Sequence, residues 1–302
     1  MEKLFLLLYV FIGLVPIFGA ADKSSTQLLY LQILNASFIF YFLFFLKKEK
    51  KIAFVTNLKS SLFLLFLLFF CWAALSVSIS INKVESLNTL TLVVTYLTTF
   101  PILYFLILEI KGIKEFFVNL MLVILSIEIF TVVSPFFYDL IEYGSFSFRS
   151  QSYSGLTGNV NIAAFSILMK LPFAFYKAIH SKKSLTITFN FLIILFSIYS
   201  IFSILSTRGA ILGILIISLL LMGQMIILFA RKKITTRIFL KRILIIILPL
   251  FLNVVINSLQ IQVFSESNQT ALTDRLETVT NLEDASNNSR LRYWKQSFIT
   301  GI

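Results

Sequence analysis

Residues 185–230 read LTITFNFLIILFSIYSIFSILSTRGAILGILIISLLLMGQMIILFA. Two long apolar runs flank the short polar turn at residues 206–210, and about 20 apolar residues are enough for a helix to cross a bilayer. Neither run alternates as a strand of a membrane barrel would, and an open sheet cannot satisfy its backbone in lipid. The stretch therefore predicts two transmembrane helices joined by a tight turn.

The same pattern recurs along the chain and predicts an all-α integral membrane protein with about nine transmembrane helices. Of its 302 residues, 58% are hydrophobic and 13% are charged, whereas a soluble domain has about 25% charged residues. The first span also fits a cleavable signal peptide, since Lys3 precedes an apolar run that ends at small residues. The expected spans are Leu4–Ala21, Gln27–Leu46, Ser61–Ile79, Leu87–Ile110, Phe116–Phe137, Val160–Ala178, Leu185–Leu205, Ala210–Ala230 and Ile243–Leu259.

The composition becomes polar at about Gln260. We therefore expect a polytopic transmembrane domain over residues 1–259 and a polar segment over residues 260–302, which the resemblance given below implies is the start of a large periplasmic loop. Within this loop a helix is expected to begin at Arg290, capped by Ser289 or Asn288. Its apolar side chains recur at helical spacing on one face, which favours a short amphipathic helix on the outer membrane surface.

Lysine and arginine residues indicate the orientation of the chain. With the N-terminus inside, the outer connections hold only Lys23, Lys83, Arg149 and Arg208. Positive charge on inner connections is typical of a cytoplasmic membrane, so we predict a multi-pass protein of such a membrane with its C-terminal segment on the outer side. The resemblance given below implies that this is the bacterial inner membrane and that the segment is periplasmic. The net charge of +12 then reflects contact with membrane lipids and not with nucleic acid. The inner connections hold Lys47, Lys48, Lys50, Lys51, Lys59, Lys111, Lys114, Lys177, Lys182, Lys183, Arg231, Lys232, Lys233, Arg237, Lys241 and Arg242.

Two arginines on the predicted outer side are candidates for binding an anion. Arg208 lies in the turn Ser-Thr-Arg-Gly-Ala, against the charge bias, and a guanidinium binds pairs of phosphate oxygens without losing its charge. The alternative is an interfacial arginine that extends to lipid phosphate. Arg290 and Trp294 are one helical turn apart and share a face. They form either a second anion site that docks on the membrane or a solvated charge beside an interfacial tryptophan.

Ionisable residues within spans are costly in lipid and usually face a partner or a cavity. Glu128 and Lys170 fall within the fifth and sixth expected spans, and they could pair across adjacent helices. Lys170 could equally extend to the inner surface. Cys71 and His180 are the single cysteine and histidine of the chain, so we expect neither an intrachain disulfide nor a histidine-rich metal site.

Three stretches resemble, in order and spacing, the O-antigen ligase and O-antigen polymerase family. Residues 157–161, Thr-Gly-Asn-Val-Asn, open a span and resemble the family's GNPN-like entry, with Val160 where the family often has proline. Residues 206–210 resemble its S-R-G-A turn, with Thr207 inserted. The run from Asp274 to Trp294 is similar to the segment that opens the family's periplasmic loop, and the ligase-related region covers roughly residues 190–302.

The resemblance implies a metal-independent membrane glycosyltransferase of the GT-C type, without a cofactor. Such proteins of lipopolysaccharide or polysaccharide biosynthesis take a glycan from undecaprenyl diphosphate on the periplasmic side. The acceptor is lipid A–core, another lipid-linked repeat, or protein. Arg208 and Arg290 would be the catalytic arginines that bind the diphosphate, and Asn161 and Trp294 would help to bind the substrate. Fixed guanidinium groups can stabilise the charge that develops on the leaving diphosphate.

In this family the catalytic base is a histidine further along the periplasmic loop, followed by further spans. The resemblance therefore implies that a chain ending at Ile302 is C-terminally incomplete and inactive, because His180 is expected on the cytoplasmic side. One alternative is a transporter or flippase of lipid-linked sugars, with a binding site at mid-bilayer near Glu128 and Lys170. Another is a membrane scaffold or sensor without catalysis.

Overall fold

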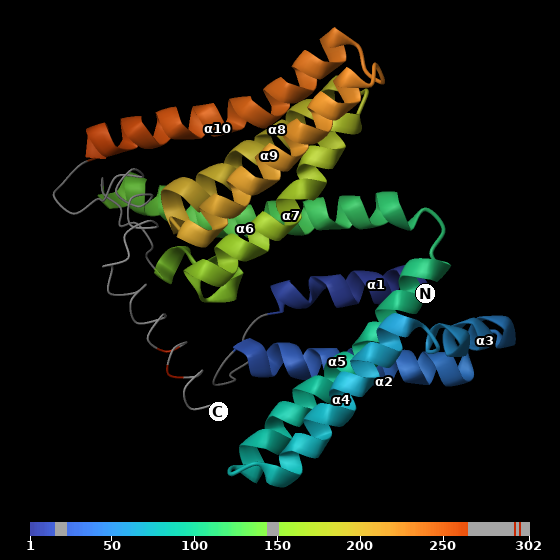
Figure 1. The fold of residues 1–302 in the computed structure, drawn as a ribbon. Coiled ribbons are helices and arrows are strands. Elements are labelled where there is room, and N and C mark those ends of the chain that lie inside the picture. Colours follow the sequence, from blue (N-terminus) through green and yellow to red (C-terminus); the bar gives the residue numbers. More distant parts are fainter. Residues whose placement is uncertain (16–22, 144–150, 265–292, 294–295, 297–302) are drawn as a thin grey trace. The chain divides into compact units, whose positions relative to one another are not determined.

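The computed structural model describes residues 1–15, 23–143, 151–264, 293 and 296, and the regular elements within them are all helices (Figure 1). Eight of these helices are long and apolar enough to cross a membrane. The protein is thus a multi-pass α-helical membrane protein, as its apolar runs predict. The eight candidate spans are Ser25–Phe44, Ser61–Ile79, Lys83–Glu109, Ile113–Tyr143, Val160–His180, Ser184–Leu205, Arg208–Ala230 and Thr236–Gln260.

The chain divides into two compact units, Met1–Leu120 and Met121–Ile302, and each is described by itself. In chain order the elements are α1 (Glu2–Val10), η1 (Phe11–Leu14), α2 (Lys23–Phe44), α3 (Lys48–Asn57), α4 (Ser61–Ile79), α5 (Lys83–Glu109), α6 (Ile113–Tyr143), η2 (Gln151–Tyr153), η3 (Gly155–Thr157), α7 (Val160–His180), α8 (Ser184–Tyr199), η4 (Ser200–Leu205), α9 (Arg208–Ala230) and α10 (Thr236–Phe264).

The first of the nine expected spans is not among the eight candidates in the described residues. Helix α1 has nine residues, about 14 Å at 1.5 Å per residue, against a hydrocarbon core of about 30 Å. The short η1 follows it, and the rest of that expected span lies outside the described residues. The span from Leu4 to Ala21 therefore stays a prediction.

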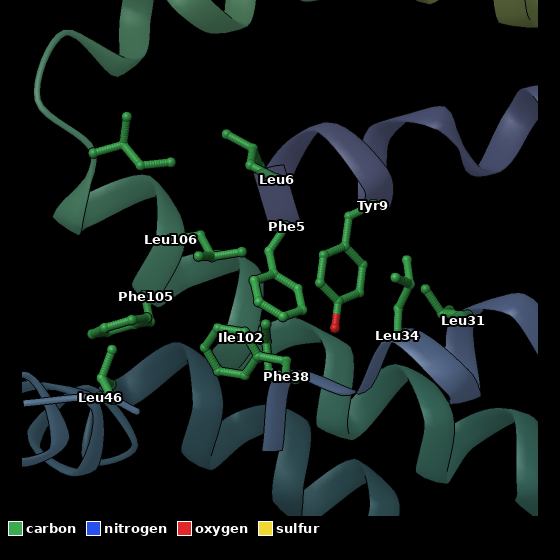
Figure 2. Close-up of a cluster of buried hydrophobic side chains, with 11 residues drawn as sticks. Phe5, Leu6, Tyr9, Leu31, Leu34, Phe38, Leu46, Ile102, Phe105 and Leu106 are labelled. Atoms are coloured by element: carbon green, nitrogen blue, oxygen red, sulfur yellow. The ribbon is translucent and has the colours of Figure 1, made fainter. Parts of the chain in front are cut away.

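Helix α1 packs into the core of the first unit, which Figure 2 shows. The buried side chains Phe5 and Leu6 of α1 lie against Phe38 of α2 and Phe105 of α5. The rings of Phe5 and Phe38 meet edge to face at 5.3 Å between centroids, a favourable geometry for aromatic pairs. Helix α1 is therefore part of the core of the first unit.

A polar cluster lies inside this apolar core. The Tyr9 hydroxyl donates to Asn35 Oδ1 at 2.8 Å, and Asn35 Nδ2 donates to the hydroxyls of Thr98 and Thr99 at 3.0 Å each. A buried amide without these partners would lose its hydration without compensation. The cluster therefore fixes the relative positions of α1, α2 and α5 within the first unit.

The connection between the second and third expected spans is itself a helix, α3. Its Phe54 packs on Phe105 of α5, with 5.4 Å between ring centroids. Lys50 of α3 forms ion pairs with Glu2 of α1 at 2.5 Å and with Glu109 of α5 at 3.5 Å. A segment that the sequence marks only as a basic loop is thus a helix anchored on one side by an aromatic side chain and an ion triad.

The second unit is built around α7, which contacts α8, α9 and α10. Two glycines of α9, Gly209 and Gly213, follow the Gly-x-x-x-Gly spacing that lets helices approach closely. A Cβ placed on Gly213 would collide with Leu168 of α7, and one on Gly209 would lie 2.9 Å from Phe165 Cζ. Small residues on α9 therefore bring the turn at residues 206–210 close to the start of α7.

Candidate functional site

The turn that carries Arg208 has an unusual backbone. Helix α8 continues into a π-helix, η4, whose six residues are all buried. The next residue, Ser206, has left-handed angles of φ 44° and ψ 45°, which for a residue other than glycine cost about 1–2 kcal/mol. π-helical turns and such strained residues concentrate at functional sites. The sequence singles out this turn by its charge, but not by its backbone.

Polar side chains of α10 hold the π-helix in place. Asn257 Nδ2 donates to Ser203 Oγ at 3.1 Å, and Gln260 Nε2 donates to the Tyr199 hydroxyl at 2.6 Å. One turn earlier, Asn253 Nδ2 donates to the backbone carbonyls of residues 249 and 195. These three residues recur at helical spacing in an apolar run, a signal that the sequence analysis missed.

The structure brings Asn161 and the turn of Arg208 together. The Thr207 hydroxyl donates to Asn161 Oδ1 at 3.4 Å, linking residues that are 46 apart in sequence. Asn161 lies in the first turn of α7, which is capped by Asn159 Oδ1 through the backbone amides of Asn161 and Ile162 at 2.9 and 3.3 Å. The half-buried Arg208 begins α9. Asn161 and Arg208 thus belong to the adjoining first turns of two helices.

The first turns of α7 and α9, with Asn161, Thr207 and Arg208, form what we call the corner at Arg208. The electrostatics of this corner favour an anion. The N-termini of α7 and α9 meet here, and each carries the positive end of a helix dipole. The Thr207 side chain makes no capping hydrogen bond to α9; its one hydroxyl proton is shared between Asn161 Oδ1 and the Leu205 carbonyl. The guanidinium of Arg208 adds a full positive charge. Two helix N-termini and an arginine are the chemistry that binds phosphate groups.

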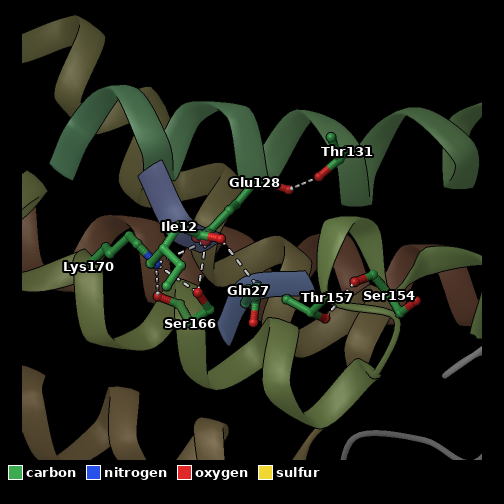
Figure 3. Close-up of polar contacts among 8 residues, drawn as sticks. All are labelled: Ile12, Gln27, Glu128, Thr131, Ser154, Thr157, Ser166 and Lys170. Carbon is green, nitrogen blue, oxygen red and sulfur yellow. Dashed lines mark hydrogen bonds and ion pairs between the residues drawn. The ribbon is translucent and has the colours of Figure 1, made fainter. Parts of the chain in front are cut away.

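The predicted pairing of the two intramembrane charges is confirmed (Figure 3). Lys170 Nζ of α7 lies 3.0 Å from Glu128 Oε1 of α6. The Ser166 hydroxyl donates to the same carboxylate oxygen at 2.8 Å. Lys170 also donates to the Ser166 carbonyl and hydroxyl oxygens at 3.1 and 2.7 Å. The lysine is thus held within the second unit, and the interpretation that it extends to the inner surface is wrong.

The other carboxylate oxygen, Glu128 Oε2, is buried and finds no hydrogen-bond partner among the described residues. The residue Glu128 borders a cavity of about 10 Å³ that is also lined by Thr131, Ser154 and Thr157, room for about one water molecule. The backbone of the segment before α7 approaches α6 closely, since a Cβ on Gly155 would lie 2.9 Å from Thr131 Oγ1. This segment therefore lies beside the residue that carries the buried ion pair on α6.

The remaining predicted residues fall elsewhere. Arg290 and Trp294 lie outside the described residues, so their predicted roles stay predictions. His180 ends α7, at the opposite end of that helix from Asn161 and roughly 30 Å along its axis at 1.5 Å per residue. Within the described part of the chain, no group of three or more His, Cys, Asp or Glu side chains could hold a metal ion.

Comparison of the chain with protein-family models, with curated proteins and with solved structures finds no match. The fold and the corner at Arg208 therefore define a class, a multi-pass α-helical membrane protein with a candidate anion site where two helices begin.

Proposed function

We propose that this protein is a membrane glycan ligase or polymerase whose donor is a glycan linked to undecaprenyl diphosphate. The observation that carries the proposal is the contact between Thr207 and Asn161. It joins two of the three stretches on which the resemblance rests, at the helix ends beside Arg208. In the proposed reaction an acceptor hydroxyl attacks the anomeric carbon. The bond from that carbon to the diphosphate breaks, the lipid diphosphate leaves with the bonding electron pair, and the proton of the hydroxyl passes to a general base.

The role proposed for Arg208 is to bind the diphosphate and to stabilise its departing negative charge. Arg290 is proposed as the second arginine, and Trp294 as the residue that docks its helix on the membrane. Lipid A–core or another lipid-linked repeat would be the acceptor, on the periplasmic side of the inner membrane. A fixed guanidinium in a poorly hydrated site contributes about 3–4 kcal/mol to a transition state by analogy with a preorganised oxyanion donor.

The proposal is tested by binding of undecaprenyl diphosphate to the purified chain in lipid nanodiscs. We expect Arg208→Ala to weaken binding by roughly 10- to 100-fold, since a hydrogen-bonded charged group contributes about 1.5–3 kcal/mol. Arg208→Lys keeps the charge but loses the planar fork, so it should bind less well than the parent. Undecaprenyl monophosphate should bind more weakly than the diphosphate.

The matched control is Arg231→Ala, because Arg231 is the C-cap residue of the same helix, α9, and is exposed. It removes one arginine from the chain at the end remote from the proposed site. Equal affinity of the parent and Arg208→Ala for the diphosphate would show that the donor site lies elsewhere. Equal losses in Arg208→Ala and Arg231→Ala would reduce the effect to overall charge.

A second candidate function is favoured by the ion pair of Glu128 and Lys170. Transporters place their substrate sites near the middle of the bilayer, and this pair lies midway along α6 and α7. A transporter of lipid-linked sugars predicts that the double variant Glu128→Leu/Lys170→Leu abolishes transport in proteoliposomes. The ligase proposal predicts that this variant still binds undecaprenyl diphosphate, because the pair is separate from the corner at Arg208.

A further inference from the structure

The short helix α3 has one face anchored on the first unit and another that is exposed. The anchored face holds Lys50, paired with Glu2 and Glu109, and Phe54, packed on Phe105. Opposite them on α3, Lys48, Ile52 and Val55 recur at intervals of four and three residues, the spacing of one helical face, and Lys59 follows in the connection to α4. All four are exposed, Ile52 by 59% and Val55 by 51%.

The short connections at both ends of α3 fix its position relative to the ends of α2 and α4. Only Phe45, Leu46 and Lys47 separate it from the end of α2, and only Leu58, Lys59 and Ser60 separate it from the start of α4. Both α2 and α4 are candidate spans. A helix tied this closely to two span ends stands at the membrane surface, where β-branched apolar side chains can insert between headgroups and lysines can meet phosphates.

The charge of this surface favours an anionic partner. Lys47, Lys48 and Lys59 are exposed, and Glu49 is the one acidic residue of α3. Lys51 lies over the Phe42 ring at 5.9 Å and donates to the Leu43 carbonyl at 2.7 Å, which holds its charge near the end of α2. A basic cluster directly beside membrane spans attracts anionic phospholipids by about 1 kcal/mol for each lysine.

We propose that α3 is a binding surface for anionic phospholipid headgroups, with Lys48 and Lys59 as the phosphate ligands and Ile52 and Val55 inserted between them. The ion triad around Lys50 and the ring of Phe54 orient the helix so that this face meets the lipid. The surface belongs to the first unit and is independent of the donor site proposed at Arg208.

The test places a fluorophore on α3 and asks which lipid approaches it. Cys71, the single cysteine of the chain, is changed to serine, and Val55→Cys carries a bimane label. The labelled full chain is reconstituted in vesicles containing brominated phosphatidylglycerol or brominated phosphatidylcholine at equal fractions. We expect phosphatidylglycerol to quench more strongly, and Lys48→Gln/Lys59→Gln to remove the preference, at about fivefold in relative binding for each lysine.

The control variant is Lys182→Gln/Lys183→Gln, which removes two exposed lysines from the connection between α7 and α8. It should keep the preference. The proposal is overturned if neither lipid quenches, if both quench equally in the parent, or if the control loses as much preference as the α3 variant. As a measurement that needs no lysine variant, the preference of the parent should fall as the salt concentration rises, and a salt-independent preference would also overturn the proposal.

Discussion

At the scale of single residues, the structure shows that the two intramembrane charges, Glu128 and Lys170, form one buried ion pair. The side chains of Glu128 and Lys170 are 8% and 17% exposed and their charged atoms are 3.0 Å apart. Removing one partner of a buried pair costs about 3–5 kcal/mol, whereas replacing both with apolar residues is often neutral or stabilising. The intact pair therefore avoids an uncompensated buried charge in the fold, and it is also a candidate functional site.

We predict that Glu128→Gln lowers the free energy of unfolding more than Glu128→Leu/Lys170→Leu does. In the single variant the ammonium of Lys170 stays in the unit without its carboxylate. Thermal unfolding in detergent, followed for the parent, the single variant and the double variant, checks the order. A single variant as stable as the parent would mean that the ion pair contributes nothing.

The ion pair of Glu2 and Lys50 leads us to predict how the stability of the protein depends on pH. The hydrogen bond from Lys50 lowers the pKa of Glu2 below its ordinary 4.5, although partial burial opposes the shift. The hydrogen bond to Glu2 likewise raises the pKa of Lys50 above 10.5. The stabilisation from Glu2 is therefore present above pH 4.5 and is lost as the pH falls through its lower folded value. The stabilisation from Lys50 is lost only as the pH rises through its folded value.

Glu2→Gln should therefore reduce stability near pH 7 by about 0.5 kcal/mol, a typical contribution of a partly exposed pair. The difference from the parent should shrink as the pH is lowered below 4.5. Melting temperatures in detergent between neutral and acid pH check this, with Glu49→Gln as the control, because Glu49 is an exposed residue of α3. A difference that persists unchanged in acid would contradict an ionic origin.

At the scale of elements, the close approach of α9 to α7 depends on glycine. A Cβ on Gly213 would meet the buried Leu168 side chain, and overpacking a tight contact costs about 1–3 kcal/mol. We predict that Gly213→Ala lowers the melting temperature and that Leu168→Ala in the same chain restores part of the loss. The control is Gly223→Ala in the same helix, where nothing lies within 4 Å, so the higher helix propensity of alanine should leave stability equal or better.

At the scale of the whole molecule, the prediction concerns which side of the membrane each connection faces. In a background without Cys71, cysteines at Ile81 and Ser152 should react with an impermeant thiol reagent in intact spheroplasts. Cysteines at Ser181 and Thr235 should react only after the membrane is opened, because their connections carry the lysines and arginines of the inner side. Labelling of the second pair in sealed cells would reverse the orientation.

The sequence alone determined the eight spans that the structure describes, because a helix in lipid is required by its own apolar length and by the need to satisfy its backbone internally. The predicted bounds of Ser61–Ile79 coincide with those of α4. The sequence also marked the turn of Arg208 and the entry at Asn161, since a charge or a capping residue at a span end is visible in one dimension.

Only the tertiary structure decided how those residues meet. The contact between Thr207 and Asn161 bridges 46 residues, and that between Lys170 and Glu128 bridges 42. Such contacts depend on which helix faces pack together, and runs that are apolar on every side carry no strong periodicity to reveal those faces. The π-helix and the left-handed Ser206 likewise depend on long-range contacts from α10, which no local propensity encodes.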